Sequence, residues 1–237
     1  VSPYIYCLNN PIVLIDPDGE DVYLVIWYTD NGEIGHAAIA FDNYKKNDEG
    51  KMVADGTVNY YDFWPGGDGA GKDNHNQNID GNIFMKENVK LNDLLNKDIG
   101  SGENRAAEGV IQLTASQEKT TELNNYNKSL YEKQDKTDPK YNGDKNNCSN
   151  FAKQTVNNVP GYEKVNGIEN INYGGNLLID PVNFNAVTPN FLFRDTRKVV
   201  KSNPARGKVL KENTDSNNKD FLNGKTHGII QDATPGK

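Results

Sequence analysis

The first third of the chain alternates short apolar segments with turn-forming residues, a pattern typical of β-strands. Residues 22–29 are mostly β-branched or aromatic and lie between polar turns, so they predict a buried strand. Residues 35–41 predict a second strand, and Asn31-Gly32 is a hairpin-type turn between the two. Residues 52–64 predict one or two further strands, and a Gly/Asn/Asp-rich loop follows over residues 65–81.

Apolar positions take on a helical spacing after this loop. Residues 87–99 and 103–113 each predict a helix. Residues 114–117 fit a capping box with Thr114 as the cap, and they predict the start of a longer helix. That helix carries a narrow apolar stripe of Leu123, Tyr126, Leu130 and Tyr131. Residues 149–158 predict a short helix that ends before a Pro-Gly pair.

The order of these elements, strands first and helices afterwards, predicts an α+β fold in which an antiparallel sheet packs against helices. Strand-like segments and loops follow residue 158, and the chain becomes polar from residue 202 onward. We therefore expect three parts: a leader over residues 1–20, a folded domain over residues 21–200 and a polar tail over residues 201–237.

The charge balance narrows the classes of partner. The 237 residues carry 26 Lys and Arg against 33 Asp and Glu, so the formal net charge is −7. Because affinity for phosphates rests on Lys and Arg, this balance argues against nucleic acid as a partner. No apolar run approaches the roughly 20 residues that a membrane span needs, and membrane contact is not expected. Two cysteines do not make a disulfide framework.

One histidine and one cysteine stand in positions suited to nucleophilic catalysis. His36 lies in the second predicted strand among small residues, which let another element approach closely. Cys148 lies at the expected start of a helix, where unpaired N–H groups and the helix dipole favour the thiolate. A nearby imidazole would take the thiol proton and later return it to a leaving group. Spacing alone leaves open the alternative that both are core residues.

Two motifs near the start of the chain carry a resemblance to a known family. Residues 4–11 read Tyr-Ile-Tyr-Cys-Leu-Asn-Asn-Pro, and residues 16–19 read Asp-Pro-Asp-Gly. They resemble the last repeat of the RHS core, the shell that encloses bacterial polymorphic toxins. The resemblance implies that a variable toxin tip follows directly. Many members have Leu after this Gly and cleave themselves there; Glu20 follows here, so self-release stays open. Cys7 is expected to be a packed strand residue.

The order of motifs over residues 22–195 resembles the circularly permuted papain-like fold, which includes NlpC-type peptidases and relatives of lecithin retinol acyltransferase. The resemblance rests on four segments, which are Gly35–Phe41, Leu113–Lys119, Lys145–Ala152 and Val187–Asn190. It implies that Cys148 is the nucleophile, that His36 is the base, and that the backbone N–H of Cys148 belongs to an oxyanion hole. A polar residue on the strand after the His orients the imidazole in this group; Asp62 is the first choice and Asn59 the alternative.

The resemblance implies a toxin domain that acts as a cysteine peptidase or amidase without a metal or an organic cofactor. An acyltransferase or phospholipase of the lecithin retinol acyltransferase type is the first alternative, and a non-catalytic binding module is the second. The expected partners are the RHS shell of the parent protein and an immunity protein that blocks the site. The domain is expected to be secreted or delivered into a target cell, which would be bacterial, for example by type VI secretion.

Several other motifs carry ordinary interpretations. Residues 66–72 match the first seven positions of a P-loop, but Asp73 replaces the hydroxyl residue that holds Mg²⁺, so we expect a flexible loop. His75 and His227 lack partners at metal-ligand spacing and are expected at the surface. The stretch over residues 197–211 holds six basic residues, and its simplest interpretation is a solvated face.

Overall fold

The computed structural model describes residues 21–28, 35–66, 78–100, 102–143, 145–173 and 182–213. The strands in this part of the chain are β1 (Asp21–Trp27), β2 (His36–Lys46), β3 (Met52–Pro65), β4 (Ile79–Lys90), β5 (Gly109–Thr114), β6 (Lys140–Tyr141), β7 (Ile168–Tyr173), β8 (Val182–Val187) and β9 (Gly207–Glu212). The helices are α1 (Leu91–Asn96), α2 (Gln117–Thr137), α3 (Cys148–Val156), α4 (Pro189–Ser202) and the short 3-10 helix η3 (Pro204–Arg206).

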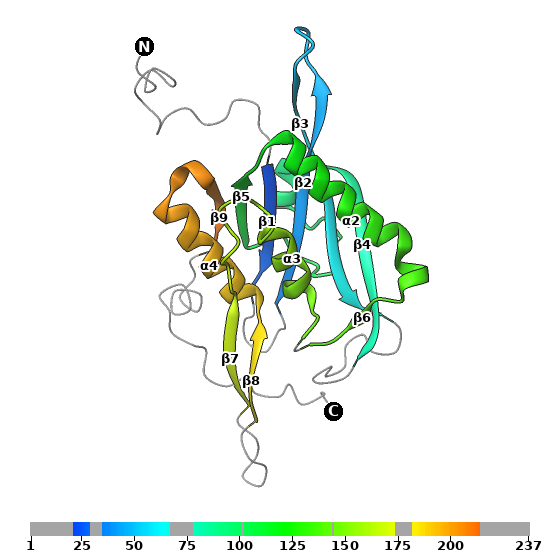
Figure 1. Cartoon of the computed structure of the whole chain (residues 1–237), viewed down its shortest axis with the longest axis vertical. Helices are drawn as coiled ribbons and strands as arrows, with labels where there is room; N and C mark the ends of the chain where they lie inside the picture. Colours follow the sequence, from blue (N-terminus) through cyan, green and yellow to red (C-terminus); the bar gives the residue numbers. More distant parts are fainter. Residues whose placement is uncertain are drawn as a thin grey trace.

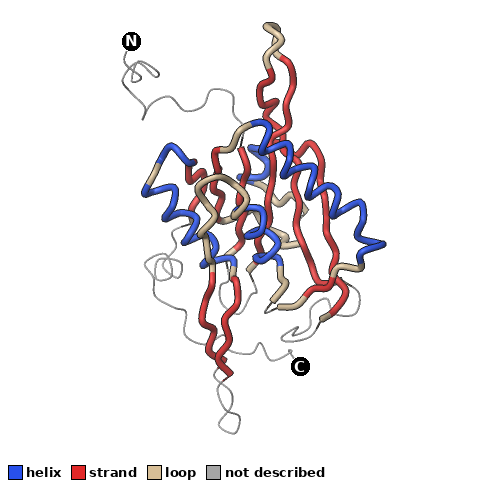
Figure 2. The backbone as a smooth tube through the Cα atoms, viewed as in Figure 1, coloured by secondary structure: helices blue, strands red, loops and turns tan. Residues whose placement is uncertain are grey.

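Seven of these strands form one sheet in the order β6-β4-β3-β2-β1-β5-β9, and each neighbouring pair is antiparallel (Figure 1). β1 lies near the middle of the sheet and is buried along its whole length, as its run of β-branched and aromatic residues predicts. The two remaining strands, β7 and β8, form a separate hairpin that projects from one end of the sheet (Figure 2). The predicted α+β class, with a large antiparallel sheet packed against helices, is confirmed.

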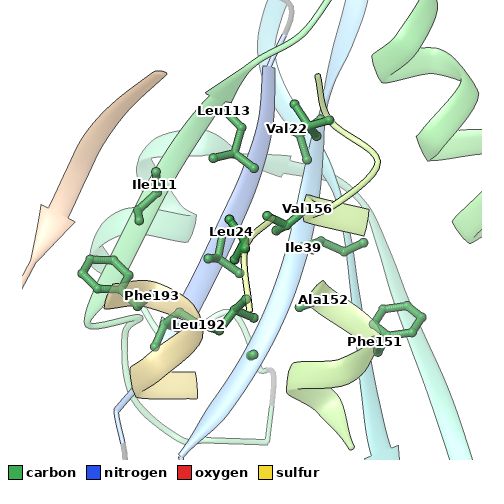
Figure 3. Packing of buried hydrophobic residues seen from close by; sticks show 14 of the residues in the cluster. Val22, Leu24, Ile39, Ile111, Leu113, Phe151, Ala152, Val156, Leu192 and Phe193 are labelled. Carbon is green, nitrogen blue, oxygen red and sulfur yellow. The ribbon is translucent and has the colours of Figure 1, made fainter. Parts of the chain in front are cut away.

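Helices α2, α3 and α4 cover one face of the sheet. The core beneath them forms because alternate residues of each strand point to this face. Leu24 and Ile39 from the two central strands meet Ala152 of α3 and Leu192 of α4 (Figure 3), and all four side chains are fully buried. Each fully buried Leu or Ile contributes about 1.5–3 kcal/mol of transfer free energy, so this layer holds the helices on the sheet.

The opposite face of the sheet carries a second, smaller core. Trp27, Tyr60 and Leu94 belong to it, with Leu94 contributed by the short helix α1. His36 is the first residue of β2, and its ring contacts Trp27 of the smaller core. The two cores therefore fix the position of the strand that carries the histidine and of the helix that carries the cysteine.

Of two helices predicted from the sequence, one is shorter than predicted and the other was wrong. Residues 87–90 continue strand β4, so only the six residues of α1 are helical in the range predicted as 87–99. Residues 109–113, predicted as the end of a helix over 103–113, belong instead to strand β5 between β1 and β9. The reason is tertiary: hydrogen bonding to strands far away in the chain outweighs the local spacing of apolar residues, and Val110 and Ile111 suit a strand.

The capping box was also misplaced by two residues. Helix α2 begins at Gln117, and the hydroxyl of Ser116, not that of Thr114, accepts a hydrogen bond from the backbone N–H of Lys119. Thr114 is the last residue of β5 and is paired with β1. The predicted apolar stripe of α2 is only partly inward, because Leu123 is buried whereas Tyr126 and Tyr131 are exposed.

The C-terminal part contains structure that the sequence did not reveal. Helix α4 begins at Pro189 under a Thr188 cap, a combination typical of helix starts that was overlooked. Strand β9, within the stretch expected to be a polar tail, adds the edge of the main sheet. The leader, Cys7, the P-loop-like segment from residue 67 onward, His75 and His227 lie outside the described residues. None of the described helices has the length and apolar character required to cross a membrane.

Candidate active site

Cys148 is the first residue of helix α3, as its sequence context predicts. The side chain of Asn147 caps this helix by accepting a hydrogen bond from the backbone N–H of Asn150 at 2.9 Å. Phe151 and Ala152 anchor the helix on the sheet, and Ala152 is fully buried. The thiol is therefore held at the positive end of a short helix, and only 5% of Cys148 is exposed.

The thiol lies where two strands of the sheet separate. The pairing of β2 with β3 ends at Ala38–Asp62, whereas β2 continues back to His36 against β1, and β3 continues to Pro65 against β4. Beyond Ala38, the backbone N–H of Ala37 lies close to the thiol of Cys148 and favours its charged form. The start of α3 thus takes the place that strand pairing leaves open, and this brings Cys148 to the His36 end of β2.

Asp62 holds the imidazole of His36 through its Nε2 atom. The Nε2 atom of His36 lies 3.3 Å from Oδ2 of Asp62, and both side chains are almost fully buried. The same carboxylate oxygen accepts hydrogen bonds from the hydroxyl of Tyr60 at 2.7 Å and from Nε1 of Trp64 at 3.0 Å. Tyr60, Asp62 and Trp64 alternate along β3, so their side chains share one face of the strand.

Two aromatic rings enclose the imidazole. The Trp64 ring stacks on the His36 ring with centroids 4.0 Å apart and an interplanar angle of 19°. The Trp27 ring lies on another side at 5.6 Å with an angle of 44°. Since Nε2 faces Asp62, the remaining ring nitrogen, Nδ1, is the one available to the thiol. Because the two rings restrict rotation of the imidazole, Nε2 stays directed at Asp62 and Nδ1 stays free to face the thiol.

The electrostatics of the buried pair favour charge separation. Burial by itself raises the pKa of Cys148, but the charge of His36, its hydrogen bond to the thiol and the N–H of Ala37 outweigh burial and lower the pKa. Burial likewise opposes the charged form of His36, yet the adjacent Cys148 and Asp62 raise its pKa above the ordinary value. The charged forms of the two groups therefore favour one another: the imidazolium stabilises the thiolate, and the thiolate stabilises the imidazolium.

Tyr141 completes the surroundings of the thiol. Its phenol lies close to the side chain and the backbone N–H of Cys148, and burial together with the nearby sulfur raises the pKa of the phenol. The ring packs against Phe63 with centroids 5.3 Å apart, which holds the hydroxyl in place. The backbone N–H of Cys148 therefore faces a tyrosine oxygen at the position where we expected an oxyanion hole.

The structure brings together the three residues expected to act: His36, Asp62 and Cys148. Asn59, the alternative to Asp62, lies elsewhere; its Oδ1 accepts hydrogen bonds from Nδ2 of Asn43 at 3.2 Å and from the backbone N–H of Asn88 at 3.4 Å. The sequence analysis missed Trp27, Tyr60, Trp64 and Tyr141. The alternation of Tyr60 and Trp64 with Asp62 along a predicted strand was a usable signal. Tyr141 carried no such signal.

The chemistry available here is nucleophilic attack by a thiolate, with proton transfer through an imidazole. Over the part of the chain that the structure describes, no group of three His, Cys, Asp or Glu residues could hold a metal ion. No family model matches the chain, and no curated protein or solved structure is significantly similar to it. The functional argument therefore rests on the geometry of the chain itself.

Proposed function

We propose that this chain is a cysteine hydrolase, a peptidase or amidase, with a circularly permuted papain-like arrangement. The observation that carries the proposal is the buried series of Asp62, His36 and Cys148, with the thiol pKa lowered and the imidazole pKa raised. A nucleophile, a base and an orienting carboxylate from three separate elements match the roles that such catalysis needs.

The permuted arrangement is supported by the order of the elements. The strand that carries His36 precedes the helix that carries Cys148, and the orienting Asp62 lies on the strand after the histidine. The stacked Trp64 shields the contact between the carboxylate and the imidazole from water, which strengthens that contact.

In the proposed reaction, the Cys148 thiolate attacks a substrate carbonyl carbon and forms a C–S bond, while the carbonyl π electrons move onto oxygen. The backbone N–H of Cys148 stabilises this oxyanion once the substrate displaces the tyrosine oxygen. When the oxyanion collapses, the bond to the leaving amine breaks and the His36 imidazolium donates its proton to that amine. Water, deprotonated by the neutral imidazole, then attacks the thioester carbon. The C–S bond breaks, the carboxylic acid leaves, and the Cys148 thiolate and the His36 imidazolium are regenerated.

We further propose that the chain is the toxin tip of an RHS polymorphic toxin, delivered into a target cell and blocked by an immunity protein. The support is the pair of leader motifs at residues 4–11 and 16–19, which lie outside the described residues. A nucleophile and a base that are already assembled suit such a protein, because an active toxin requires an inhibitor in the cell that makes it.

The experiment replaces each of the two cysteines with alanine; Cys148→Ala is the test and Cys7→Ala is the control. Cys148→Ala should abolish toxicity when the chain is produced in bacteria, whereas Cys7→Ala should leave it intact. Circular dichroism and thermal unfolding check that both variants fold. Killing by a folded Cys148→Ala variant would refute the hydrolase. Activity of the wild type on liposomes but not on peptides or peptidoglycan would instead favour the acyltransferase or phospholipase alternative.

A further inference from the structure

The side chain of Asn147 is buried and uses its full hydrogen-bonding capacity. Its Oδ1 atom accepts from the backbone N–H of Asn150 at 2.9 Å and from Nδ2 of the same residue at 3.3 Å. Its Nδ2 atom donates to the carbonyl of Gly143 at 2.7 Å and to the carbonyl of Val187 at 3.0 Å. A primary amide has two N–H donors and one oxygen with two lone pairs, so every donor and acceptor is satisfied.

The two ends of this amide contribute differently. The oxygen caps α3, which a Ser, Thr or Asp side chain would also do. The nitrogen joins the start of α3 to two segments outside the helix, the turn at Gly143 and the last residue of β8, Val187. Only an amide offers the cap oxygen and both donors at this length, so the cap alone does not account for asparagine here.

The carbonyl of Val187 lies on a well-anchored segment. The next residue, Thr188, donates from its hydroxyl to Glu169 at 2.9 Å, and its backbone N–H donates to the carbonyl of Gly167 at 3.1 Å. The Thr188 hydroxyl also accepts from the N–H of Phe191 and so caps α4. The tether from Asn147 therefore ends on a rigid junction between β8 and α4.

Cys148 follows Asn147 directly, so the backbone of Asn147 sets the direction in which the thiol leaves the helix. The thiol must reach both the imidazole of His36 and the N–H of Ala37, which lie on the sheet and not on α3. A small rotation of the first helical turn would keep the core packing of Ala152 but would lengthen these contacts. The two donated hydrogen bonds oppose such a rotation.

We propose that Asn147 is a positioning residue, whose amide N–H groups lock the start of α3 to Gly143 and Val187 and thereby align the Cys148 thiol with His36. This inference rests on the proposed function, because it concerns the nucleophile of that reaction. The inference is nevertheless independent of the substrate, because it states that the two hydrogen bonds donated by the Asn147 amide control the reactivity of the thiol.

The test compares Asn147→Ser and Asn147→Gly in the full chain that carries Cys7→Ala. Both residues are accepted at N-caps, but neither has an amide donor. The rate at which iodoacetamide alkylates Cys148 is measured across pH, together with the free energy of unfolding in urea. We expect the alkylation midpoint to move upward and the rate at about pH 6 to fall at least about fivefold, since each pKa unit changes the thiolate fraction about tenfold.

The control is Ser116→Ala, which removes the cap of α2, a helix that does not carry the thiol. It should lower stability without moving the alkylation midpoint. An unchanged midpoint in both Asn147 variants, or an equal change in the control, would overturn the proposal. If neither variant unfolds cooperatively, the amide is a folding determinant and the positioning role is rejected. Alkylation needs no substrate, so an unchanged midpoint would reject only the positioning role of Asn147. A toxic Cys148→Ala variant would instead reject the proposed hydrolase.

Discussion

Asp62→Asn tests the centre of the proposed site with almost no change in shape. In the folded protein, one carboxylate oxygen faces Nε2 of His36 at 3.3 Å and also accepts from Tyr60 and Trp64. The amide oxygen of asparagine can keep these acceptor contacts but carries no charge. Any change in the titration of His36 therefore reports the charge of Asp62 and not its size.

The magnitude follows from the kind of hydrogen bond that is replaced. A contact between an imidazolium and a carboxylate is about twice as strong as a neutral hydrogen bond, a difference of about 1–1.5 kcal/mol. Since about 1.4 kcal/mol corresponds to one pKa unit, Asp62→Asn should lower the pKa of His36 by about one unit. The bare Coulomb attraction at this separation, about 5 kcal/mol at an effective dielectric constant of 20, sets the upper bound.

The assay is an NMR titration of the His36 ring in a Cys148→Ala background. Cys148 is a major contributor to the raised pKa of His36, so removing the thiol isolates the effect of Asp62. Asp55→Asn is the matched control, because Asp55 lies on the same strand and accepts only from Thr57 among the described contacts. A His36 pKa that stays the same in Asp62→Asn, or falls equally in Asp55→Asn, would refute the orienting role.

Three further results are expected. Tyr141→Phe should raise the alkylation midpoint of Cys148 by roughly half a pKa unit, since one hydrogen bond of about 0.5–1.5 kcal/mol is lost while the ring remains packed; an unchanged midpoint would contradict this. Trp64→Ala should remove the ring-current displacement of the His36 ring protons, which Trp64→Phe should largely retain. Burial and the nearby Asp21 raise the pKa of Asp42 to about 7, above the unfolded value of about 3.9, so the contribution of Asp42 to stability should fall as pH rises from about 4 to 7. Urea unfolding should show a flatter pH dependence for Asp42→Asn.

The sequence predicted elements well where the pattern alone decides the structure. β1 is buried on both faces and reads as a continuous apolar run, and α3 has an Asn cap followed by inward-facing residues. Prediction failed where the partner lies far away in the chain. Residues 109–114 become a strand because β1 and β9 pair with them, and no local signal indicates this pairing. β3 likewise continues through Gly56, at φ +85°, where the sequence left open a break.

The candidate site likewise has features that local sequence predicts and features that depend on distant parts of the chain. The helix start at Cys148 and the strand position of His36 are local properties, and they were predicted from their neighbours. The position of the thiol depends on the separation of β2 from β3 beyond Ala38, which is a property of the whole sheet. The contact of Tyr141 with Cys148, and that of the Asn147 amide with the carbonyl of Val187, join segments that no local pattern brings together.

His36 and Asp62 are therefore held by many contacts, whereas the position of Cys148 depends on a few hydrogen bonds at the start of its helix. Strand pairing, two aromatic rings and three donors to one carboxylate oxygen hold His36 and Asp62. Cys148, in contrast, sits on a helix of only nine residues, whose start is joined to its surroundings by the amide of Asn147. We therefore expect the reactivity of the thiol to depend on the contacts that hold the start of α3, namely the hydrogen bonds from Asn147 to Gly143 and Val187. Substitutions at Asn147 should thus shift the thiol titration more than they shift the titration of His36 measured in the Cys148→Ala background.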